Sequence, residues 1–143
     1  FGSEVVGIDG RNGRILWTAS TEDWIWGGPT LADGSLYAGD LAGNLYALDI
    51  ENGRELWRVS ADGAITGSPL VANESVYIAT ENGEVLSVSL EGRIQWTQTI
   101  LGRLYGTPVA AGELLLFGVV EADAIVVALD ANGATQWSFV PAN

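Results

Sequence analysis

Carboxylates are the side chains of this sequence that could carry chemistry. The 143 residues include 18 Asp and Glu against 6 arginines, with no histidine, cysteine, lysine or methionine, and the formal net charge is -12. Without His and Cys, zinc, copper and haem lack their usual ligands, and nucleophile arrangements of the Ser-His or Cys-His kind are excluded. Acidic loops could still bind Ca²⁺ through oxygen atoms, although no loop has the spacing of an EF-hand.

Three of the carboxylates recur at one place in a repeated motif. The motif reads ALDIENGRELW at 47–57, and its copies lie at 7–17, 87–96 and 128–137. Each copy ends in a tryptophan four residues after a glycine: Trp17 after Gly13, Trp57 after Gly53, Trp96 after Gly92 and Trp137 after Gly133. The carboxylates are Asp9, Asp49 and Asp130. An Asp at this point of a turn accepts N–H bonds from its own backbone, so we expect all three to be structural.

The segments between the tryptophans repeat with the same period of 40, 39 and 41 residues. A Gly-x-Pro marker at 27–29, 67–69 and 106–108 indicates the start or free edge of a strand. Segments 35–39, 75–79 and 114–118 are short and rich in apolar residues, as strands are, and turns such as Asn82-Gly83 follow them. A third strand leads into the motif, and a fourth carries the tryptophan. No window shows the apolar period of a helix, so each unit is predicted to be a four-stranded antiparallel meander.

Three such units are complete, at 24–61, 62–100 and 101–140, and residues 4–19 supply only the third and fourth strands of another. Four-stranded sheets that repeat every 40 residues or so are typical of a β-propeller. We therefore predict that residues 1–143 are all-β and form a β-propeller sector of about three and a half four-stranded antiparallel blades. A solenoid of the same period is the alternative, and it is disfavoured because solenoid repeats rarely hold four consecutive antiparallel strands.

The motif resembles the tryptophan-docking motif of the quinoprotein-type, or PQQ-like, propeller repeat, Ala-x-Asp-x-x-Thr-Gly-x-x-x-Trp. Ala47, Asp49, Gly53 and Trp57 match it, with Asn52 where the family often has Thr. The other copies match at Gly7, Asp9, Gly13 and Trp17, at Ala128, Asp130, Gly133 and Trp137 with one turn residue deleted, and at Gly92 and Trp96 with the same deletion and with Ser87 and Ser89 replacing Ala and Asp. The resemblance implies that each indole docks between neighbouring blades.

The resemblance leaves two functional readings open. Dehydrogenases of the family hold pyrroloquinoline quinone and Ca²⁺ near the propeller axis, with a catalytic Asp and often a disulfide of adjacent cysteines. This sequence has no Cys and no insertion loops. It is more similar to non-catalytic members, such as the lipoprotein of the outer-membrane β-barrel assembly machine and the sensor propellers of bacterial kinases. We therefore expect no catalytic, cofactor or metal site and an extracytoplasmic scaffold or sensor, with a segment of a quinoprotein dehydrogenase as the alternative.

A partner surface is predicted where loops gather. In a propeller blade, the loops between blades and those between the second and third strands share one rim, called here the first rim, and the other turns form the opposite rim. The first rim holds eight acids, Glu22, Asp23, Asp40, Asp62, Glu81, Glu84, Glu121 and Asp123, and one arginine, Arg103. Aromatic residues stand beside them at Trp24, Trp26 and Tyr105. Of these, Trp24, Trp26, Arg103, Tyr105, Asp23 and Asp40 are the candidate contacts for a cationic or extended peptide. The alternative is that Trp26 and Tyr105 plug the axis and that the acids serve solubility.

Two other partner classes are excluded, and one kind of partner is expected. A surface this acidic repels nucleic acid and anionic lipid. The longest apolar run, 114–120, is far shorter than the roughly 20 residues of a membrane-spanning helix. Three and a half blades also leave two apolar faces and two sheet edges uncovered, and such surfaces recruit partners. We expect either the remaining blades of a larger propeller, which we favour, or a protein partner. A repeating subunit of an extracellular assembly is a third, purely structural reading.

Overall fold

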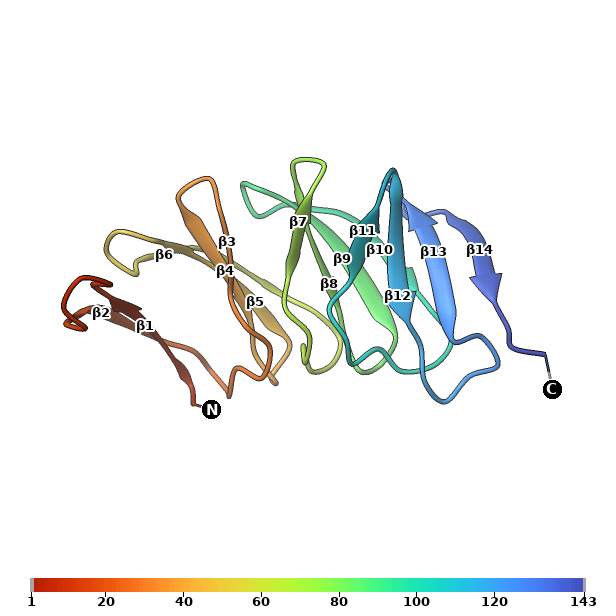
Figure 1. Cartoon of the computed structure of the whole chain (residues 1–143), viewed down its shortest axis with the longest axis horizontal. Helices are drawn as coiled ribbons and strands as arrows, with labels where there is room; N and C mark the ends of the chain where they lie inside the picture. Colours follow the sequence, from red (N-terminus) through yellow and green to blue (C-terminus); the bar gives the residue numbers. More distant parts are fainter. Residues whose placement is uncertain (1, 143) are drawn as a thin grey trace.

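Four antiparallel β-sheets lie side by side in chain order (Figure 1). The computed structural model describes residues 2–142, and among them there is no helix. The first sheet has two strands, β1 (Glu4–Ile8) and β2 (Ile15–Ser20), and each later sheet has four, paired in chain order. This confirms the predicted all-β fold of four-stranded antiparallel sheets.

The twelve later strands are these. The second sheet comprises β3 (Thr30–Ala32), β4 (Ser35–Gly39), β5 (Asn44–Asp49) and β6 (Glu55–Ser60). The third comprises β7 (Leu70–Ala72), β8 (Ser75–Ala79), β9 (Glu84–Ser89) and β10 (Ile94–Thr99). The fourth comprises β11 (Val109–Ala111), β12 (Leu114–Gly118), β13 (Val126–Asp130) and β14 (Thr135–Phe139).

Each tryptophan sits beside an irregularity in strand pairing. In the second sheet Trp57 pairs with Ala47, but the next residue along β5, Leu48, pairs with Glu55, so β6 carries one extra residue. The same shift occurs beside Trp17, Trp96 and Trp137. A bulge of this kind bends the strand and interrupts the alternation of side chains between the two faces of the sheet, so that one side chain points in a new direction. It therefore positions every indole in the same way on its sheet.

The core lies between successive sheets, because each sheet packs one face on the next. Val5 of the first sheet packs in one cluster with Ala38, Tyr46 and Leu48 of the second. A second cluster joins the second and third sheets, and a third cluster joins the third and fourth. Tyr37 and Tyr77 are buried at the same position of these two clusters. The sheets are thus held as layers, and no sheet has a core of its own.

One predicted strand is shorter than its apolar run. The apolar run spans residues 114–120, but β12 ends at Gly118, as the segment 114–118 predicts. Val120 is exposed and instead forms an isolated bridge with Arg103 in the connection between the third and fourth sheets. The bridge holds the end of the run against another segment, where the partner strand β13 does not reach. The following residue, Glu121, has a positive φ of 59°, which turns the chain into the β12–β13 loop.

Candidate functional site

Three tryptophans join each sheet to the next. The indole Nε1 of Trp17 donates to the carbonyl oxygen of Ile50 at 2.9 Å, that of Trp57 to Leu90 at 2.8 Å, and that of Trp96 to Ala131 at 2.9 Å. Each ring also lies on the glycine of the next sheet's turn: Trp17 on Gly53, Trp57 on Gly92 and Trp96 on Gly133. A side chain on any of these glycines would collide with the ring. Trp137, in the last strand, is 44% exposed.

The repeated carboxylates are engaged inside their own turns. Asp9 accepts the backbone N–H of Arg11 at 3.0 Å, Asp49 that of Glu51 at 2.8 Å, and Asp130 that of Asn132 at 2.9 Å. The Arg11 side chain also binds Asp9, and this contact, with the backbone N–H of Arg11, holds the pKa of Asp9 below its usual value. The oxygens of Asp49 and Asp130 thus shape the turns on which the indoles of Trp17 and Trp96 rest.

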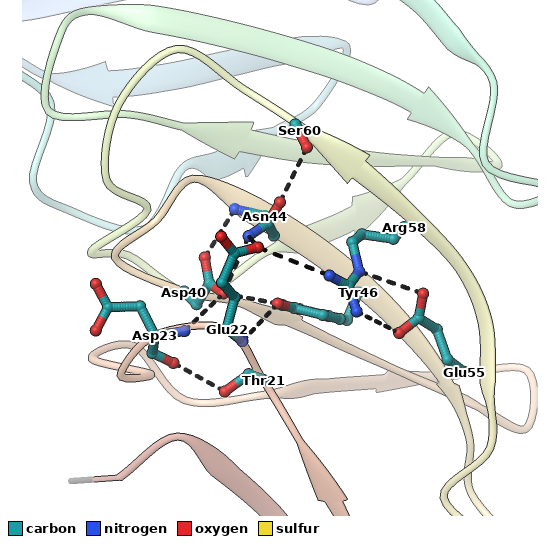
Figure 2. A network of polar contacts seen from close by, with 9 residues as sticks. All are labelled: Thr21, Glu22, Asp23, Asp40, Asn44, Tyr46, Glu55, Arg58 and Ser60. Carbon is teal, nitrogen blue, oxygen red and sulfur yellow. Dashed lines mark hydrogen bonds and ion pairs between the residues drawn. The ribbon is translucent and has the colours of Figure 1, made fainter.

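On the first rim, Asp40 is the centre of a buried network, and its expected role as a partner contact was wrong (Figure 2). Its side chain is 0% exposed. It accepts the Tyr46 hydroxyl at 2.7 Å, the Asn44 backbone N–H at 2.8 Å and, at 3.3 Å, the backbone N–H of Asp23. A carboxylate surrounded by donors in this way is shielded from any partner. Asp40 therefore fixes the loops of the first rim and does not present charge on it.

Tyr46 links this network to the connection between the first and second sheets. Its hydroxyl accepts the backbone N–H of Glu22 at 2.9 Å while it donates to Asp40. Burial, with the neighbouring Asp40 carboxylate, raises the pKa of Tyr46 to about 12, because both disfavour the phenolate. The guanidinium of Arg58 lies 4.6 Å from the ring centroid, at cation–π distance.

Arg58 and Glu22 complete the network at the surface. Arg58 binds Glu55 at 2.9 Å and lies 3.8 Å from Glu22, which also accepts from the Asn44 side chain at 3.1 Å. Tyr46, Asn44 and Arg58 were not predicted as site residues, because in the sequence they are ordinary residues of predicted strands. Comparison of the repeats carries the signal that could have found them: the place of Asp40 is taken by Thr80 in the next unit, where its hydroxyl binds the Asp62 carbonyl.

Trp26 and Tyr105 meet at one cavity on the first rim. The cavity has a volume of about 590 Å³ and is lined by Trp26, Leu41, Ala64, Thr66, Glu81 and Tyr105. Both aromatic side chains are exposed, and Glu81 supplies the one charged group among the lining residues. Of the other predicted contacts, Trp24 is exposed outside the lining, and Asp23 accepts the N–H of Trp24. Arg103 is paired with Glu121 at 2.9 Å, which raises the pKa of its guanidinium.

The cavity is positioned by close backbone contact between three sheets. Trp26, Thr66 and Tyr105 each precede the glycine of a Gly-x-Pro marker. A Cβ on Gly27 would lie 2.5 Å from the carbonyl carbon of Gly67, and a Cβ on Gly67 would lie 2.5 Å from the oxygen of Gly106. Only glycine allows this spacing. The Thr66 hydroxyl also donates to the Tyr105 carbonyl at 3.0 Å, so the three preceding side chains are brought to one place.

Two kinds of feature are missing from residues 2–142. Across that range, no three or more Asp or Glu side chains are grouped so that they could hold a metal ion. Nor does any helix there have the length and apolar character needed to cross a membrane.

Comparison with known proteins identifies the repeat. The family described as outer membrane protein assembly factor BamB matches residues 2–99 and 88–143. BamB from Moraxella catarrhalis is 27% identical over 96% of this chain, with a TM-score of 0.79. Quinohemoprotein alcohol dehydrogenase from Comamonas testosteroni is 19% identical over 96% of the chain, with a TM-score of 0.82, a likeness of fold alone. The computationally designed Ika4 protein is 14% identical over 89% of the chain, with a TM-score of 0.76.

This chain corresponds to only part of each similar protein. This chain spans 42% of the BamB chain and 32% of the dehydrogenase chain, against 79% of the designed protein. Comparison with curated protein sequences gives no match. The family match covers almost the whole sequence, and the tryptophan seams described above repeat along it. The chain therefore belongs to the PQQ-like β-propeller repeat family, the family described as outer membrane protein assembly factor BamB.

Proposed function

We propose that this propeller segment is a non-catalytic scaffold that binds an extended, cationic segment of a partner protein through the first rim. The observation that carries the proposal is the cavity between Trp26 and Tyr105, with Glu81 in its lining. Its volume of about 590 Å³ falls in the range of small ligand sites, roughly 300 to 1,000 Å³. A lysine or arginine side chain entering it would meet two aromatic rings and a carboxylate.

Electrostatics favours the same kind of partner. Cation–π contacts with Trp and Tyr are worth about 0.5 to 2 kcal/mol, more where water is excluded. The net charge of -12 attracts a cationic segment from a distance and increases its association rate. Trp and Tyr are also the residue types that most often dominate binding energy at interfaces. An exposed aromatic pair above a tightly packed glycine backbone is thus a rigid anchor point.

The comparisons support a scaffold role but do not identify a partner. The matching family is named for an outer membrane protein assembly factor, and that name describes a function in assembly. We extend the role, and an extracytoplasmic location, to this chain as part of the proposal.

The dehydrogenase alternative requires a binding site for pyrroloquinoline quinone, and the rim cavity does not match the charge of this cofactor. Pyrroloquinoline quinone carries several carboxylates, whereas the charged side chain lining the cavity is itself a carboxylate, Glu81. The nearby cation on this rim, Arg103, is paired with Glu121. The repeated Asp9, Asp49 and Asp130 are engaged in their turns. The residues present therefore do not fit this cofactor.

A peptide-binding experiment tests the proposal. A fluorescent, extended peptide of alternating Arg and Ser is titrated with the chain at low salt, and its anisotropy gives the dissociation constant. We expect Trp26→Ala and Tyr105→Ala each to weaken binding by at least tenfold, and Glu81→Gln by several-fold. Trp24→Ala and Glu51→Gln are the matched controls, since Trp24 lies outside the cavity lining and Glu51 lies in a turn of the opposite rim.

Two results would contradict the proposal. Equal affinity of all variants would show that the cavity is not the site. Reduction of a dye by the chain with added pyrroloquinoline quinone and Ca²⁺ would instead favour the dehydrogenase reading.

A further inference from the structure

Several turns of the chain contain an asparagine followed by glycine, a pair that the proposed function does not use. The pairs lie at 12–13, 52–53, 82–83 and 132–133. In such a pair the glycine backbone nitrogen can attack the side-chain amide carbon of the asparagine, because glycine has no side chain to hinder the approach. Asn52, Asn82 and Asn132 are exposed, so water reaches the product of this attack. These pairs are thus candidates for spontaneous deamidation.

The reaction needs no reagent other than water. A bond forms between the glycine nitrogen and Cγ of the asparagine, the amide C–N bond breaks, and the glycine N–H proton leaves with the released ammonia. Water then opens the resulting five-membered imide at either of its carbonyl groups. One opening gives aspartate. The other gives isoaspartate, in which the backbone runs through the side chain and is longer by one methylene group.

The folded turns hold the attacking nitrogen in a hydrogen bond. Gly53 donates its N–H to the Asp49 carbonyl at 2.8 Å, and Gly133 donates to the Asp130 carbonyl at 3.0 Å. The nitrogen must lose its proton and approach the asparagine side chain before it can attack, and a donated hydrogen bond opposes both steps. At Asn52 the target is held as well, since its Oδ1 accepts the backbone N–H two residues later at 2.9 Å. The reaction therefore proceeds from an opened turn.

An indole from the preceding sheet keeps two of these turns closed. The ring of Trp17 lies on Gly53, and the ring of Trp96 lies on Gly133. Each indole also donates a hydrogen bond, at 2.9 Å, to a carbonyl oxygen of the same turn. Opening of either turn must break the indole contact in addition to the hydrogen bonds of the turn itself, so these turns open less often than they would without the ring.

The Asn82–Gly83 turn has the same chemistry without a tryptophan. Gly83 has a φ of 85° and donates its N–H to the Thr80 carbonyl at 3.0 Å. The atoms nearest to a Cβ built on it belong to the backbone of Ile100 and Gly102. This turn is an internal reference, because unfolding of the whole chain exposes every pair, whereas loss of one indole exposes only the turn beneath it.

We infer that Asn52–Gly53 and Asn132–Gly133 are deamidation sites that the indoles of Trp17 and Trp96 restrain, and that isoaspartate at either site prevents the indole from docking again. The added methylene group moves the glycine away from the carbonyl that accepts the indole N–H. The ring and the hydrogen bond then no longer fit the turn together. A transient opening between two sheets thereby becomes permanent.

The test compares the same sites in the unmodified chain, in Trp17→Ala and in Trp96→Ala. Each chain is kept at mildly alkaline pH, and peptide mapping by mass spectrometry gives the deamidation rate at every site. We expect Trp17→Ala to raise the rate at Asn52 relative to Asn82 by about fivefold or more, which is the effect of one lost hydrogen bond on an opening equilibrium. Trp96→Ala should raise the rate at Asn132 in the same way and leave the ratio of Asn52 to Asn82 unchanged.

Two controls separate the local effect from unfolding. Circular dichroism checks that each variant is folded. Where Trp17→Ala is not folded, Trp17→Phe replaces it, because phenylalanine keeps an aromatic ring and removes the N–H donor, and the same rise confined to Asn52 is expected. In concentrated urea no indole is docked, so the variants and the unmodified chain should deamidate at equal rates at each site.

The effect of the product on docking is tested in a chain that carries Asn12→Gln, Asn82→Gln and Asn132→Gln. Ageing of this chain in urea modifies Asn52 as its remaining Asn-Gly pair, and the refolded product is compared with an Asn52→Asp variant of the same chain. That variant has the new charge without the added methylene group. We expect a lower urea midpoint for the aged chain, because only isoaspartate displaces Gly53 from the ring of Trp17.

Defined results would overturn the inference. Equal acceleration at Asn52, Asn82 and Asn132 in each variant, or no acceleration at any of them, would exclude the restraining role of the indoles. Equal urea midpoints of the aged chain and the Asn52→Asp chain would exclude the effect on docking. Peptide binding at the first rim is measured separately, and the turns beneath Trp17 and Trp96 belong to the opposite rim, so either proposal can fail while the other stands.

Discussion

Trp57 ties the second sheet to the third through Leu90. Its indole nitrogen lies 2.8 Å from the Leu90 carbonyl oxygen, and its ring rests on Gly92 of the same turn. On its own sheet the ring packs against Tyr37, with centroids 5.7 Å apart. One side chain therefore belongs to two layers of the core at once.

Loss of this side chain should destabilise the whole segment. Trp57 is part-buried, so it removes less surface from water than the roughly 150 to 250 Å² of a fully buried tryptophan, and its truncation to alanine should cost the lower part of the typical range of about 3 to 5 kcal/mol. We expect Trp57→Ala to lower the free energy of unfolding by about that amount, measured by urea denaturation followed by circular dichroism. Trp24→Ala is the control and should cost less than about 1 kcal/mol, because Trp24 is exposed. A denaturation midpoint close to that of the parent chain would refute the docking role.

The glycine on which the ring rests can be tested separately from the tryptophan itself. Gly53 and Gly13 have nearly the same backbone, with φ of 72° and 74°, but only Gly53 carries an indole, that of Trp17. At both positions, substitution by alanine costs about 1 to 2 kcal/mol of stability, because alanine is disfavoured in the left-handed conformation. In Gly53→Ala the new methyl group must also displace the ring, which typically costs a further 1 to 3 kcal/mol. The two variants should therefore differ clearly in the free energy of unfolding of the monomer, and equal losses would contradict the contact.

The buried network gives a third prediction. Asp40→Ala would leave the Tyr46 hydroxyl and the backbone N–H groups of Asn44 and Asp23 without their acceptor. Hydrogen bonds to a charged group are worth about 1.5 to 3 kcal/mol, and a buried donor left unpaired costs about as much. We expect a loss of about 3 kcal/mol on denaturant unfolding. Asp62→Ala removes an exposed acid from the same rim and should change stability little, so similar losses in the two variants would contradict the assigned role of Asp40.

Alkaline pH should weaken the fold through Tyr46. Its pKa is raised from 10 to about 12 by burial and by Asp40, so the folded chain holds the phenolic proton more tightly than the unfolded chain. The resulting stability is fully present below about pH 10 and is lost as the pH rises toward 12, on the order of 2 kcal/mol in all. Burial raises the pKa of Tyr37 in the same direction.

The composition of the chain makes this measurable. The sequence has no lysine or cysteine, so neither of these residue types adds a titration in the alkaline range. Urea unfolding at several pH values above 9 gives the slope of stability against pH, and tyrosinate absorbance gives the titration itself. Tyr46→Phe lowers stability below pH 10 because Asp40 loses a donor, but its loss of stability with pH above 10 should be shallower than that of the parent chain. An unchanged slope would exclude Tyr46 as the source.

Repetition made the fold predictable from the sequence. A tryptophan every 40 residues or so, with turn glycines and Gly-x-Pro markers in step, indicates sheets that recur, and short alternating segments then place the strands. The period itself cannot give the direction of a side chain in a loop. Asp40 was placed on the first rim because its loop is there, but its carboxylate points inward to Tyr46 and Asn44.

The candidate cavity was predictable only in part, again because the repeat period places a loop but does not give the direction of its side chains. Trp26 and Tyr105 stand at the same point of their units, before a Gly-x-Pro marker, and equivalent positions of neighbouring sheets come together in space. Trp24 is equivalent to Ala64, which lines the cavity, yet Trp24 itself lies outside the lining. The carboxylate that lines the cavity, Glu81, comes from the β8–β9 loop. The grouping of loops by rim placed this loop on the first rim, but it did not distinguish Glu81 from the other seven acids there.

Two neighbouring hairpins make a final prediction about backbone strain. The β3–β4 turn, Asp33-Gly34, and the β7–β8 turn, Asn73-Glu74, both have positive φ at their two central residues, at 48° and 76° and at 50° and 57°. This geometry suits Asp or Asn followed by glycine. Glu74 carries a side chain where its neighbour has none, and a residue other than Gly, Asn or Asp is strained at such a φ.

Glu74→Gly should therefore stabilise the chain by roughly 0.5 to 1 kcal/mol, which is the strain relieved less the added freedom of glycine in the unfolded state. Glu113 occupies the corresponding place before β12, but its φ is not positive, since Gly112 takes the left-handed position there at 62°. Glu113→Gly relieves no strain and adds only unfolded-state entropy, so it should destabilise slightly. Opposite signs in the two urea midpoints are expected because net charge changes equally in both variants. A shift of the same sign in both would assign the effect to that shared loss of charge and would exclude the backbone at Glu74 as its cause.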